Sequence, residues 1–560
     1  MGLAWVLLAL FYLAGLFWLA RWGERNSTKA KRFSSHPAIY SLALAIYCTA
    51  WTFYGSVGEA SRTNWNYLPI LLGPILLYLF GYRFIYKLAL VSKKQHITTI
   101  ADFISSRYGK RQNVALMVTL IALLATIPYI ALQLKAIGSA FIIISGQVNG
   151  QLVIFLAASS IATFSILFGT KQTDVTEYRR GLMLAIAFES SIKLIALVVV
   201  AIVGFTLWQH QSSSALFSNL TSNEALATFQ TGSFWGQTLM AAAAVICLLN
   251  IAVFSDSLLL QCLVFVGGLS AATAMIIVAT LTLSTMLTND VIMPKLLVNN
   301  HFNKGSLDYT NKILHIRRWV IGAILLLAFF YQQQIANTSS LSSIGLLAFS
   351  LVVQLLPAIV GGLYWKRGHA QGVYAGFITG IGSWILWLIV PSIDSSVSTS
   401  LQSEDITRGA ILSLAVNCLA YIVFSLLARP RLADKIQALA FVAPKEAMSG
   451  RTKRRLGKTQ AIDLMTLMTT FMGENRCQQL LADYQLNSGN TVEPHEPPDQ
   501  EFLSFCERAL GGVLGASTAK ALLDSALNGR KLDFEEVANV FDETTQAMQF
   551  NMSALLISLE

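Results

Sequence analysis

The sequence of 560 residues is strongly apolar, with 54% hydrophobic residues, only 12% charged residues and a mean hydropathy of +0.57. Soluble globular chains carry about 25% charged residues, so the composition excludes a single soluble enzyme of this length. In such a chain the formal net charge of +10 does not indicate affinity for nucleic acid. The question is which side of a bilayer holds the excess of Lys and Arg. The six cysteines have no CxxC or metal-ligand spacing, and we interpret them as small buried side chains. The composition predicts a polytopic membrane protein with a polar tail.

Apolar segments of the length that spans a bilayer, about 20 residues, follow one another through the first 430 positions. A cleavable signal peptide is the alternative for the first segment, but no basic residue precedes it, as a signal peptide would require. Pro128 lies inside a long segment and predicts a kink there. The predicted spans are residues 3–20, 37–58, 67–91, 113–145, 152–170, 181–208, 319–331, 344–364, 371–391 and 409–428.

Lys and Arg cluster after alternate spans, which predicts an outer N-terminus and an inner C-terminus. The pair Lys366 and Arg367 is thus expected inside, and residues 392–408 outside. One region conflicts with this alternation. Residues 237–287 contain two apolar segments, whereas the charge pattern on either side requires an odd number of crossings. We expect one of the two segments to be partial or re-entrant.

After residue 430 the composition becomes polar. Residues 431–458 form a basic linker, predicted to lie near an anionic inner leaflet; the alternative is that these are positive residues trailing the last span. Asp499, after two prolines, is expected to cap a helix. The last predicted helix reaches Glu560 without a C-cap, so we expect it to continue beyond this residue. Short amphipathic helices are predicted at 459–473, 474–486, 499–510, 517–527 and 534–559.

Two charged residues are expected at membrane depth. Glu189 and Lys193 are one helical turn apart in the span 181–208, and Glu189 lies about 12 Å in from Gly181 at 1.5 Å per residue. One interpretation is an i,i+4 ion pair that only neutralises itself inside the bundle. The other is a role in substrate or proton handling, because ionisable groups within the membrane are costly and commonly functional.

Small and hydroxyl-bearing residues interrupt two spans. Residues 47–58 of the second span are rich in Thr, Ser and Gly, which permits an unwound helix with free carbonyls that can hold a cation or solute. Residues 267–274 have the same character. Close packing of small residues against another helix is the alternative at both places, and composition alone favours it.

Several motifs resemble known families. Three of them resemble the sodium/solute symporter family: Gln354 to Arg367 with Gly372 and Gly376, Thr99 to Gly109, and Thr173-Asp174. More closely, residues 47–55, 128–135 and 188–193 resemble the transporter-like sensor domain of bacterial hybrid histidine kinases. Residues 505–512 with Gly515 and Ala516 resemble the STAC domain of the same proteins.

The resemblance implies an all-α LeuT-type bundle of inverted repeats, with about 11–13 spans and a small cytoplasmic STAC domain. It places a sodium ion at the backbone carbonyls of Ala45 and Cys48. The partner span would add Ala271 and two hydroxyls, but Ala274 and Met275 stand at the hydroxyl positions. A shift of one residue recovers Ser270 and Thr273. Because the hydroxyls are missing, we expect solute binding to depend weakly on sodium or not at all, with proton coupling through Glu189 if transport occurs. The residues expected on the solute or proton path are Trp51, Tyr54, Gln133, Glu189 and Lys193.

No nucleotide-binding, metalloprotease or nucleophile-elbow motif occurs in the sequence, and no catalytic residue is expected within it. The leading hypothesis is the sensory input region of a two-component sensor kinase in a bacterial inner membrane. It would bind, and in one version import, an amino acid such as histidine or a short carboxylate such as acetate.

The expected partners of this input region are PAS and kinase modules, a response regulator and a second copy through the signalling helix. The alternative is a stand-alone sodium- or proton-coupled symporter with a regulatory tail. The expected domains are a symporter-like domain (1–430), the linker (431–458), a STAC-like domain (459–530) and a signalling helix (531–560).

Overall fold

The computed structural model of the chain describes most of the predicted spans and part of the tail. The described residues are 2–25, 32, 34, 36–45, 48–55, 68–95, 97–146, 150–170, 180–210, 258–298, 309–336, 341–393, 403–430, 432–442, 460–488, 493–514, 519–520 and 523. Within these ranges the regular elements are helices, and no strand occurs. Nine helical segments of the described part are long and apolar enough to cross a membrane. The chain is therefore an all-α polytopic membrane protein, which confirms the fold class predicted from composition.

The first half of the chain contributes long helices and an interrupted one. Its elements are α1 (Gly2–Gly23), α3 (Pro37–Leu44), the π-helical turn η2 (Trp51–Gly55), α5 (Leu68–Phe80), α6 (Tyr82–Gln95), α7 (Ile100–Arg107), α8 (Gln112–Ser145), α9 (Gln151–Gly169) and α10 (Arg180–His210). Helix α8 runs through Pro128 as one continuous element of 34 residues.

The second half begins with α14 (Leu258–Leu287), which continues through η5 (Thr288–Ile292) into α15 (Met293–Val298). The remaining membrane elements are α16 (Tyr309–Tyr331), η6 (Gln332–Ala336), α17 (Leu341–Val352), η7 (Val353–Leu355), α18 (Leu356–Tyr364), α19 (Ala370–Trp384), η8 (Ile385–Ile389), α20 (Val390–Ile393) and α21 (Ser403–Leu427). The following elements are α22 (Leu432–Val442), α23 (Ala461–Met472), α24 (Glu474–Ser488) and α25 (Gln500–Leu514).

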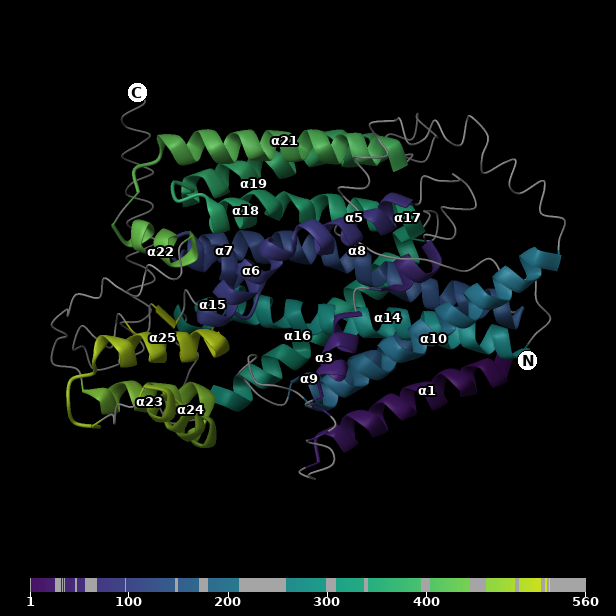
Figure 1. Cartoon of the computed structure of the whole chain (residues 1–560), viewed down its shortest axis with the longest axis horizontal. Coiled ribbons are helices and arrows are strands. Elements are labelled where there is room, and N and C mark those ends of the chain that lie inside the picture. The colour runs from purple at the N-terminus through teal and green to yellow at the C-terminus, as the bar shows by residue number, and fades with distance from the viewer. Residues whose placement is uncertain are drawn as a thin grey trace.

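The long helices form an elongated bundle, with α1 and α10 along one edge and α19 and α21 along the opposite edge (Figure 1). Helices α23, α24 and α25 form a separate group at one end of the bundle, beside α15 and α16 (Figure 1). Helix α8 lies in the middle and contacts α14, α16 and α17. The centre of the molecule is therefore built from helices that are far apart in sequence.

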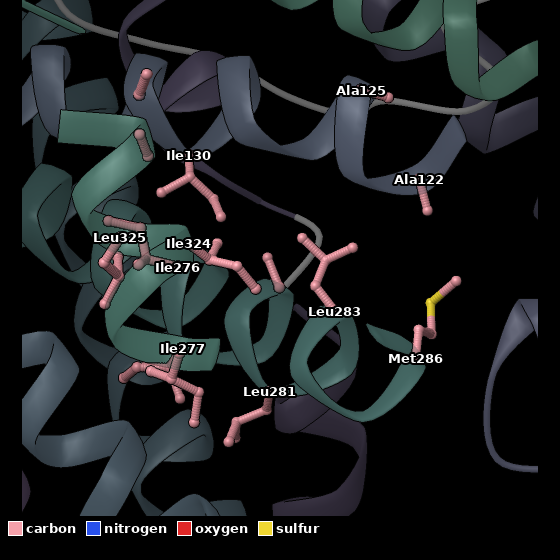
Figure 2. Packing of buried hydrophobic residues seen from close by; sticks show 14 of the residues in the cluster. Ala122, Ala125, Ile130, Ile276, Ile277, Leu281, Leu283, Met286, Ile324 and Leu325 are labelled. Carbon is pink, nitrogen blue, oxygen red and sulfur yellow. The ribbon is translucent and has the colours of Figure 1, made fainter. Parts of the chain in front are cut away.

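The centre of the bundle is packed with aliphatic side chains. Figure 2 shows Ile130 of α8, Ile276 of α14 and Ile324 of α16 converging between their helices, and all three are almost fully buried. Because lipid is as apolar as these side chains, close van der Waals packing rather than transfer out of water holds such helices together. Met286 and Leu283 extend the same packing along α14 (Figure 2).

Helices α19 and α21 approach each other closely along glycines spaced four residues apart. A Cβ atom added at Gly372 would lie 2.0 Å from the Ser425 hydroxyl oxygen, and one at Gly376 would lie 2.4 Å from the Asn417 amide oxygen. Neither position can hold a larger residue without movement. The two glycines of the symporter-like motif thus serve helix contact, as small residues commonly do in membranes.

Two predicted spans differ from the observed elements. The predicted span 67–91 is divided at Gly81 into α5 and α6 by a bend, although the Gly81 amide still bonds the Leu77 carbonyl (2.7 Å) and the Gly81 carbonyl the Ile85 amide (3.1 Å). The second predicted span is interrupted after Leu44, which its Thr, Ser and Gly content permitted but composition alone did not favour. The apolar segment 237–257, where the number of crossings conflicts with the charge pattern, lies outside the described residues.

The start of the predicted linker is helical. Residues 432–442 form α22, which packs against α7 and α18, with Phe441 in edge-to-face contact with Phe103. The boundary predicted at residue 430 is therefore displaced to Val442, because the apolar face of α22 docks on the membrane domain. Residues 443–459 and 524–560 are not described, so the rest of the predicted linker and the signalling helix lie outside the structure.

Three predicted tail helices are present. Helix α23 is capped by a hydrogen bond from the Gln460 amide to the Asp463 carboxylate (3.0 Å), and α25 by one from the Phe502 amide to Asp499 (2.6 Å). Their apolar faces share one core that also contains Met293 of α15 and Ile313 of α16. This group of helices is therefore docked on the membrane domain.

Candidate functional site

The interrupted second span is the centre of the candidate site. Helix α3 ends at Leu44, and Ala45 is its C-cap. After residues 46 and 47, which are not described, the chain passes through Cys48 and Thr49 to η2, whose Phe53 amide bonds the Thr49 carbonyl (2.8 Å). An interruption of this kind within a membrane bundle frees backbone carbonyls, which buried side chains or ions must then satisfy.

Lys193 of α10 satisfies one of these carbonyls. Its ammonium donates a hydrogen bond of 2.9 Å to the Cys48 carbonyl oxygen, and its side chain is only 2% exposed. A long side chain from a neighbouring helix thus reaches the break in the second span. An ammonium–carbonyl bond is charge-assisted and stronger than a neutral one.

Glu189, one turn earlier on α10, is fully buried and points to other partners. Its Oε1 atom accepts hydrogen bonds from the Tyr12 hydroxyl of α1 (3.1 Å) and from the Thr273 hydroxyl of α14 (2.5 Å). The Ser270 hydroxyl donates to the Glu189 backbone carbonyl (2.6 Å). The carboxylate therefore links α10 to two other helices.

The structure revises the interpretation of Glu189 and Lys193 as a simple ion pair. Among the described residues no direct salt bridge joins the two side chains; each binds a separate partner, although their charges still interact. The reason is geometric, because Lys193 is drawn to the Cys48 carbonyl and Glu189 to the hydroxyls of α1 and α14.

The residues predicted to bind sodium lie in this region, but their donor atoms are committed elsewhere. The Ala45 carbonyl accepts the Cys48 amide (3.0 Å), and the Cys48 carbonyl accepts Lys193. Ala271, predicted to contribute its backbone carbonyl, and Ala274 are fully buried in α14, and Ala274 offers no side-chain oxygen. The two hydroxyls that a shift of one residue would recover, those of Ser270 and Thr273, both bind Glu189.

Two of the residues predicted on the solute path meet at the same place. The Gln133 side-chain oxygen of α8 accepts the amide of Ala50, the residue before Trp51 (2.9 Å). Trp51 packs in a small cluster with Tyr129 and Leu132 of α8 and Ile344 and Ala348 of α17. Its indole nitrogen lies against Gly345, where an added Cβ would be 2.4 Å away.

Tyr54 has a different environment from Trp51. Its ring lies against Gly268 of α14, and a Cβ atom at that glycine would overlap the ring. Gly267 likewise accommodates Phe53 and Ala196. The Gly-rich stretch of α14 is therefore a packing surface within a continuous helix, which is the alternative that composition favoured.

Several buried polar atoms of this region have no hydrogen-bond partner among the described residues. They are the Trp51 indole nitrogen, the Gln133 amide nitrogen and Glu189 Oε2. Leaving a buried donor or acceptor unpaired costs about 1–3 kcal/mol. Groups of this kind commonly mark a place where a ligand or an ordered water completes the hydrogen bonding.

Sequence reasoning missed other residues of the region. Tyr12 lies in the first span without any polar neighbour in sequence. Tyr129 of α8 forms a hydrogen bond of 2.8 Å with the hydroxyl of Thr49, which precedes η2 in the predicted Thr-, Ser- and Gly-rich stretch. Each contact joins positions at least 80 residues apart. The signal that could have identified Tyr12 and Tyr129 is a tyrosine in the middle of an apolar span, where its hydroxyl requires a partner.

A second group of buried polar residues lies where two of the symporter-like motifs meet, those of residues 99–109 and 354–367. The Arg107 guanidinium of α7 donates to the carbonyls of Gly362 and Trp365 (2.9 Å each). The Tyr108 hydroxyl donates to the Ala358 carbonyl (2.8 Å) and lies 2.7 Å from the Tyr421 hydroxyl. We refer to Arg107, Tyr108, Gly362 and Trp365 as the α7–α18 corner.

Comparisons with known proteins find a partial sequence similarity and a similar fold. No protein-family model matches the sequence. The chain is similar to the uncharacterized symporter YodF of Bacillus subtilis (strain 168), with 25% identity over 186 residues, or 33% of this chain. The match spans 36% of that relative.

A solved structure supports the fold assignment. The chain is similar to a Na⁺-coupled sialic acid symporter in a substrate-bound, outward-open state, with a TM-score of 0.52 and 12% identity. The likeness covers 76% of this chain and 97% of that structure. At this identity it shows the fold alone: the membrane domain has the all-α fold of a symporter-type transporter. Neither comparison bears on the predicted link to sensor kinases.

Proposed function

We propose that the chain is a symporter-like membrane protein that binds and carries a small carboxylate-bearing solute at the interrupted second span. The observation that carries this proposal is the pair of buried donors without acceptors, Trp51 Nε1 and Gln133 Nε2, on the two elements that meet at the break. A carboxylate oxygen of a solute would supply the missing acceptors. Amino acids and short carboxylates have this group, which agrees with the solute classes expected from the sequence.

The proposal is supported by the contrast between two buried tryptophans. Trp384 of α19 donates its indole N–H to the Ser350 hydroxyl (2.7 Å), whereas Trp51 has no acceptor among the described residues. Both side chains are buried. In the proposed function a solute completes the hydrogen bonding of Trp51, whereas Trp384 already has its acceptor.

The test is uptake and binding of labelled histidine and acetate by the purified chain in proteoliposomes, with Trp51→Phe and Trp384→Phe as a matched pair. We expect Trp51→Phe to weaken solute binding at least about tenfold, or about 1.4 kcal/mol. Trp384→Phe should leave solute binding unchanged and lower thermal stability instead. Equal solute affinity in both variants, or no uptake of any small carboxylate, would contradict the proposal.

For orientation, we infer an outer N-terminus and an inner α18–α19 loop, from the Lys and Arg distribution. The loop contains Lys366 and Arg367 between two candidate spans. A cysteine introduced at position 367 should therefore react with a membrane-impermeant thiol reagent only after the membrane is opened. Labelling from the outside of intact cells would reverse the proposed orientation.

A second candidate function is sensory: the tail would report the state of the membrane domain to kinase modules. The observation in its favour is the docking of α25. The Glu507 carboxylate forms an ion pair with Lys110, which follows α7, and the Val513 carbonyl accepts Arg317 of α16 (3.2 Å). Arg317 is 2% exposed and also contacts Asn289 of η5 (3.4 Å).

The tail is thereby connected to the helix that carries Ser270 and Thr273, because α14 continues into η5. In the sensory function, addition of solute changes the protection of α25 from hydrogen exchange, and Glu507→Lys abolishes this change while solute binding persists. In the transport function alone, solute leaves the exchange of α25 unchanged.

A further inference from the structure

We propose that the Lys193 ammonium is a resident cation that takes the place of a bound sodium ion at the interrupted second span. The inference goes beyond the proposed solute site, because it concerns the cation that lies beside that site. Its basis is the hydrogen bond between Lys193 Nζ and the Cys48 carbonyl.

The break in the second span creates a requirement for a cation. Between α3 and η2 the backbone is not helical at Cys48 and Thr49. The Thr49 carbonyl is bonded by the Phe53 amide (2.8 Å), whereas the Cys48 carbonyl accepts a side chain from another helix. Unwound carbonyls at this depth are the groups that coordinate a monovalent cation in transporters with broken helices. Here the cation at the Cys48 carbonyl is the ammonium of Lys193, attached to α10 and 2% exposed.

The remaining donors do not fit a sodium ion. Sodium is a hard cation that needs several oxygen ligands, by the same logic that governs other hard ions. The Ala45 carbonyl is bound by the Cys48 amide. The hydroxyls of Ser270 and Thr273 are turned to Glu189, while Ala274 and Met275 offer a methyl group and a thioether. In the wild-type chain the hydroxyls predicted from the sequence are therefore turned to Glu189, and the Cys48 carbonyl holds Lys193.

The charges of the region agree with an occupied cation position. Glu189 is one turn from Lys193, and its Oε2 atom accepts no hydrogen bond from the described residues. The carboxylate and the ammonium interact electrostatically, so together they are near neutrality without any further ion. A sodium ion added beside Lys193 would be repelled by the fixed ammonium charge, and this repulsion is large where water is excluded.

Removal of the Lys193 ammonium would change the surroundings of two groups. The Cys48 carbonyl would lose its partner, and the Glu189 charge would lose its counter-ion. The vacated position would then contain a carbonyl oxygen and a nearby carboxylate, which are the groups that attract a hard cation. Sodium should therefore bind the variant that lacks Lys193, although it does not bind the wild-type chain.

The test uses the purified full-length chain in detergent without any solute, so that its outcome is independent of the proposed transport. The midpoint of thermal unfolding is measured in sodium chloride and in choline chloride at equal ionic strength, for the wild type and for Lys193→Ala. Lys135→Ala, which removes a half-buried lysine from α8, is the matched control. Lys193→Gln is the second variant, because its amide keeps a donor for the Cys48 carbonyl without the charge.

We expect the wild type and Lys135→Ala to unfold at the same temperature in both salts. Lys193→Ala and Lys193→Gln should be destabilised in choline and should regain part of the loss in sodium. A specific stabilisation of the wild type by sodium would overturn the proposal. So would Lys193 variants that are as stable as the wild type in choline, or that are equally destabilised in both salts. Failure of solute uptake in the earlier experiment would leave these results unaffected.

Discussion

The interrupted second span and the α7–α18 corner both bury polar side chains, but they satisfy them to different degrees. At the corner, the Arg107 guanidinium and the Tyr108 hydroxyl each bond backbone carbonyls of α18 or its following loop. At the interrupted span, Trp51, Gln133 and Glu189 each keep an atom without a partner among the described residues. Fully satisfied polar networks stiffen a structure, and unpaired buried groups commonly mark a place completed by water or a ligand. From this contrast we propose a structural role for the corner and a functional role for the interrupted span.

The largest expected effect tests the structural side of this comparison. Arg107→Ala removes two charge-assisted hydrogen bonds worth about 1.5–3 kcal/mol each. The Gly362 carbonyl loses this partner, whereas the Trp365 carbonyl keeps the Gly368 amide (3.3 Å). We expect a loss of about 3–6 kcal/mol in stability, measured as a lower midpoint of thermal unfolding and a lower yield of folded protein. Arg111→Ala is the control, since Arg111 forms a partly exposed ion pair with Asp434 at 3.3 Å and should cost under about 1 kcal/mol. Similar losses in both variants would remove the distinction between the corner and its surroundings.

The next effect tests the functional side. Removing only Glu189 or only Lys193 leaves the other charge buried without its counter-charge, which costs about 3–5 kcal/mol. The double variant Glu189→Leu with Lys193→Met avoids that penalty, so we expect it to insert and fold but to lose solute binding. Circular dichroism and size-exclusion chromatography test folding, and binding of labelled solute tests function. Normal solute binding by the double variant would show that the pair is structural, like the corner.

The smallest effect concerns pH and the loop next to the corner. Burial lowers the pKa of His369 below its ordinary value of 6.5, and the charge of Arg111 lowers it further, whereas Asp434 at 3.5 Å opposes the shift. The folded chain therefore binds fewer protons than the unfolded chain near this pH. The stability contributed by neutral His369 is present above pH 6.5 and is lost as the pH falls through the folded pKa.

We therefore expect a shallow decrease in the unfolding temperature as the pH falls below 6.5. His369→Asn should flatten this decrease, because Asn keeps a helix-capping oxygen for the Gln371 amide but does not titrate. An unchanged slope in the variant would assign the pH dependence to other groups.

The fold could be predicted from sequence to the extent that it depends on local patterns. Apolar length located most of the long helices. The Thr, Ser and Gly content of the second span permitted its interruption, although composition alone favoured close packing. The break at Gly81 and the docking of α22 could not be predicted in this way. A single glycine inside an apolar run does not reveal whether the helix continues, and the basic residues around α22 obscured its apolar face.

The candidate site was predictable in its residues but not in its contacts. Glu189 and Lys193 were identified because charges are rare at membrane depth. Their partners, Tyr12 and the Cys48 carbonyl, are 177 and 145 residues away, and only the packing of α1 and η2 against α10 and α14 brings them together. Every residue has a backbone carbonyl, so a sequence does not show which carbonyl will need a partner. The contact between Lys193 and the Cys48 carbonyl could therefore be recognised only in the folded chain.

The contact between Arg317 and the Val513 carbonyl has a practical consequence for dissecting the protein. A membrane domain cut after Val442 would lose α25, and Arg317 would keep its place against Asn289 while losing the carbonyl of the tail. Met293 and Ile313, now covered by the tail core, would become an uncovered apolar surface of the kind that promotes aggregation. We therefore expect a chain shortened after Val442 to associate through this surface, so that the full-length chain is the one to use for transport measurements.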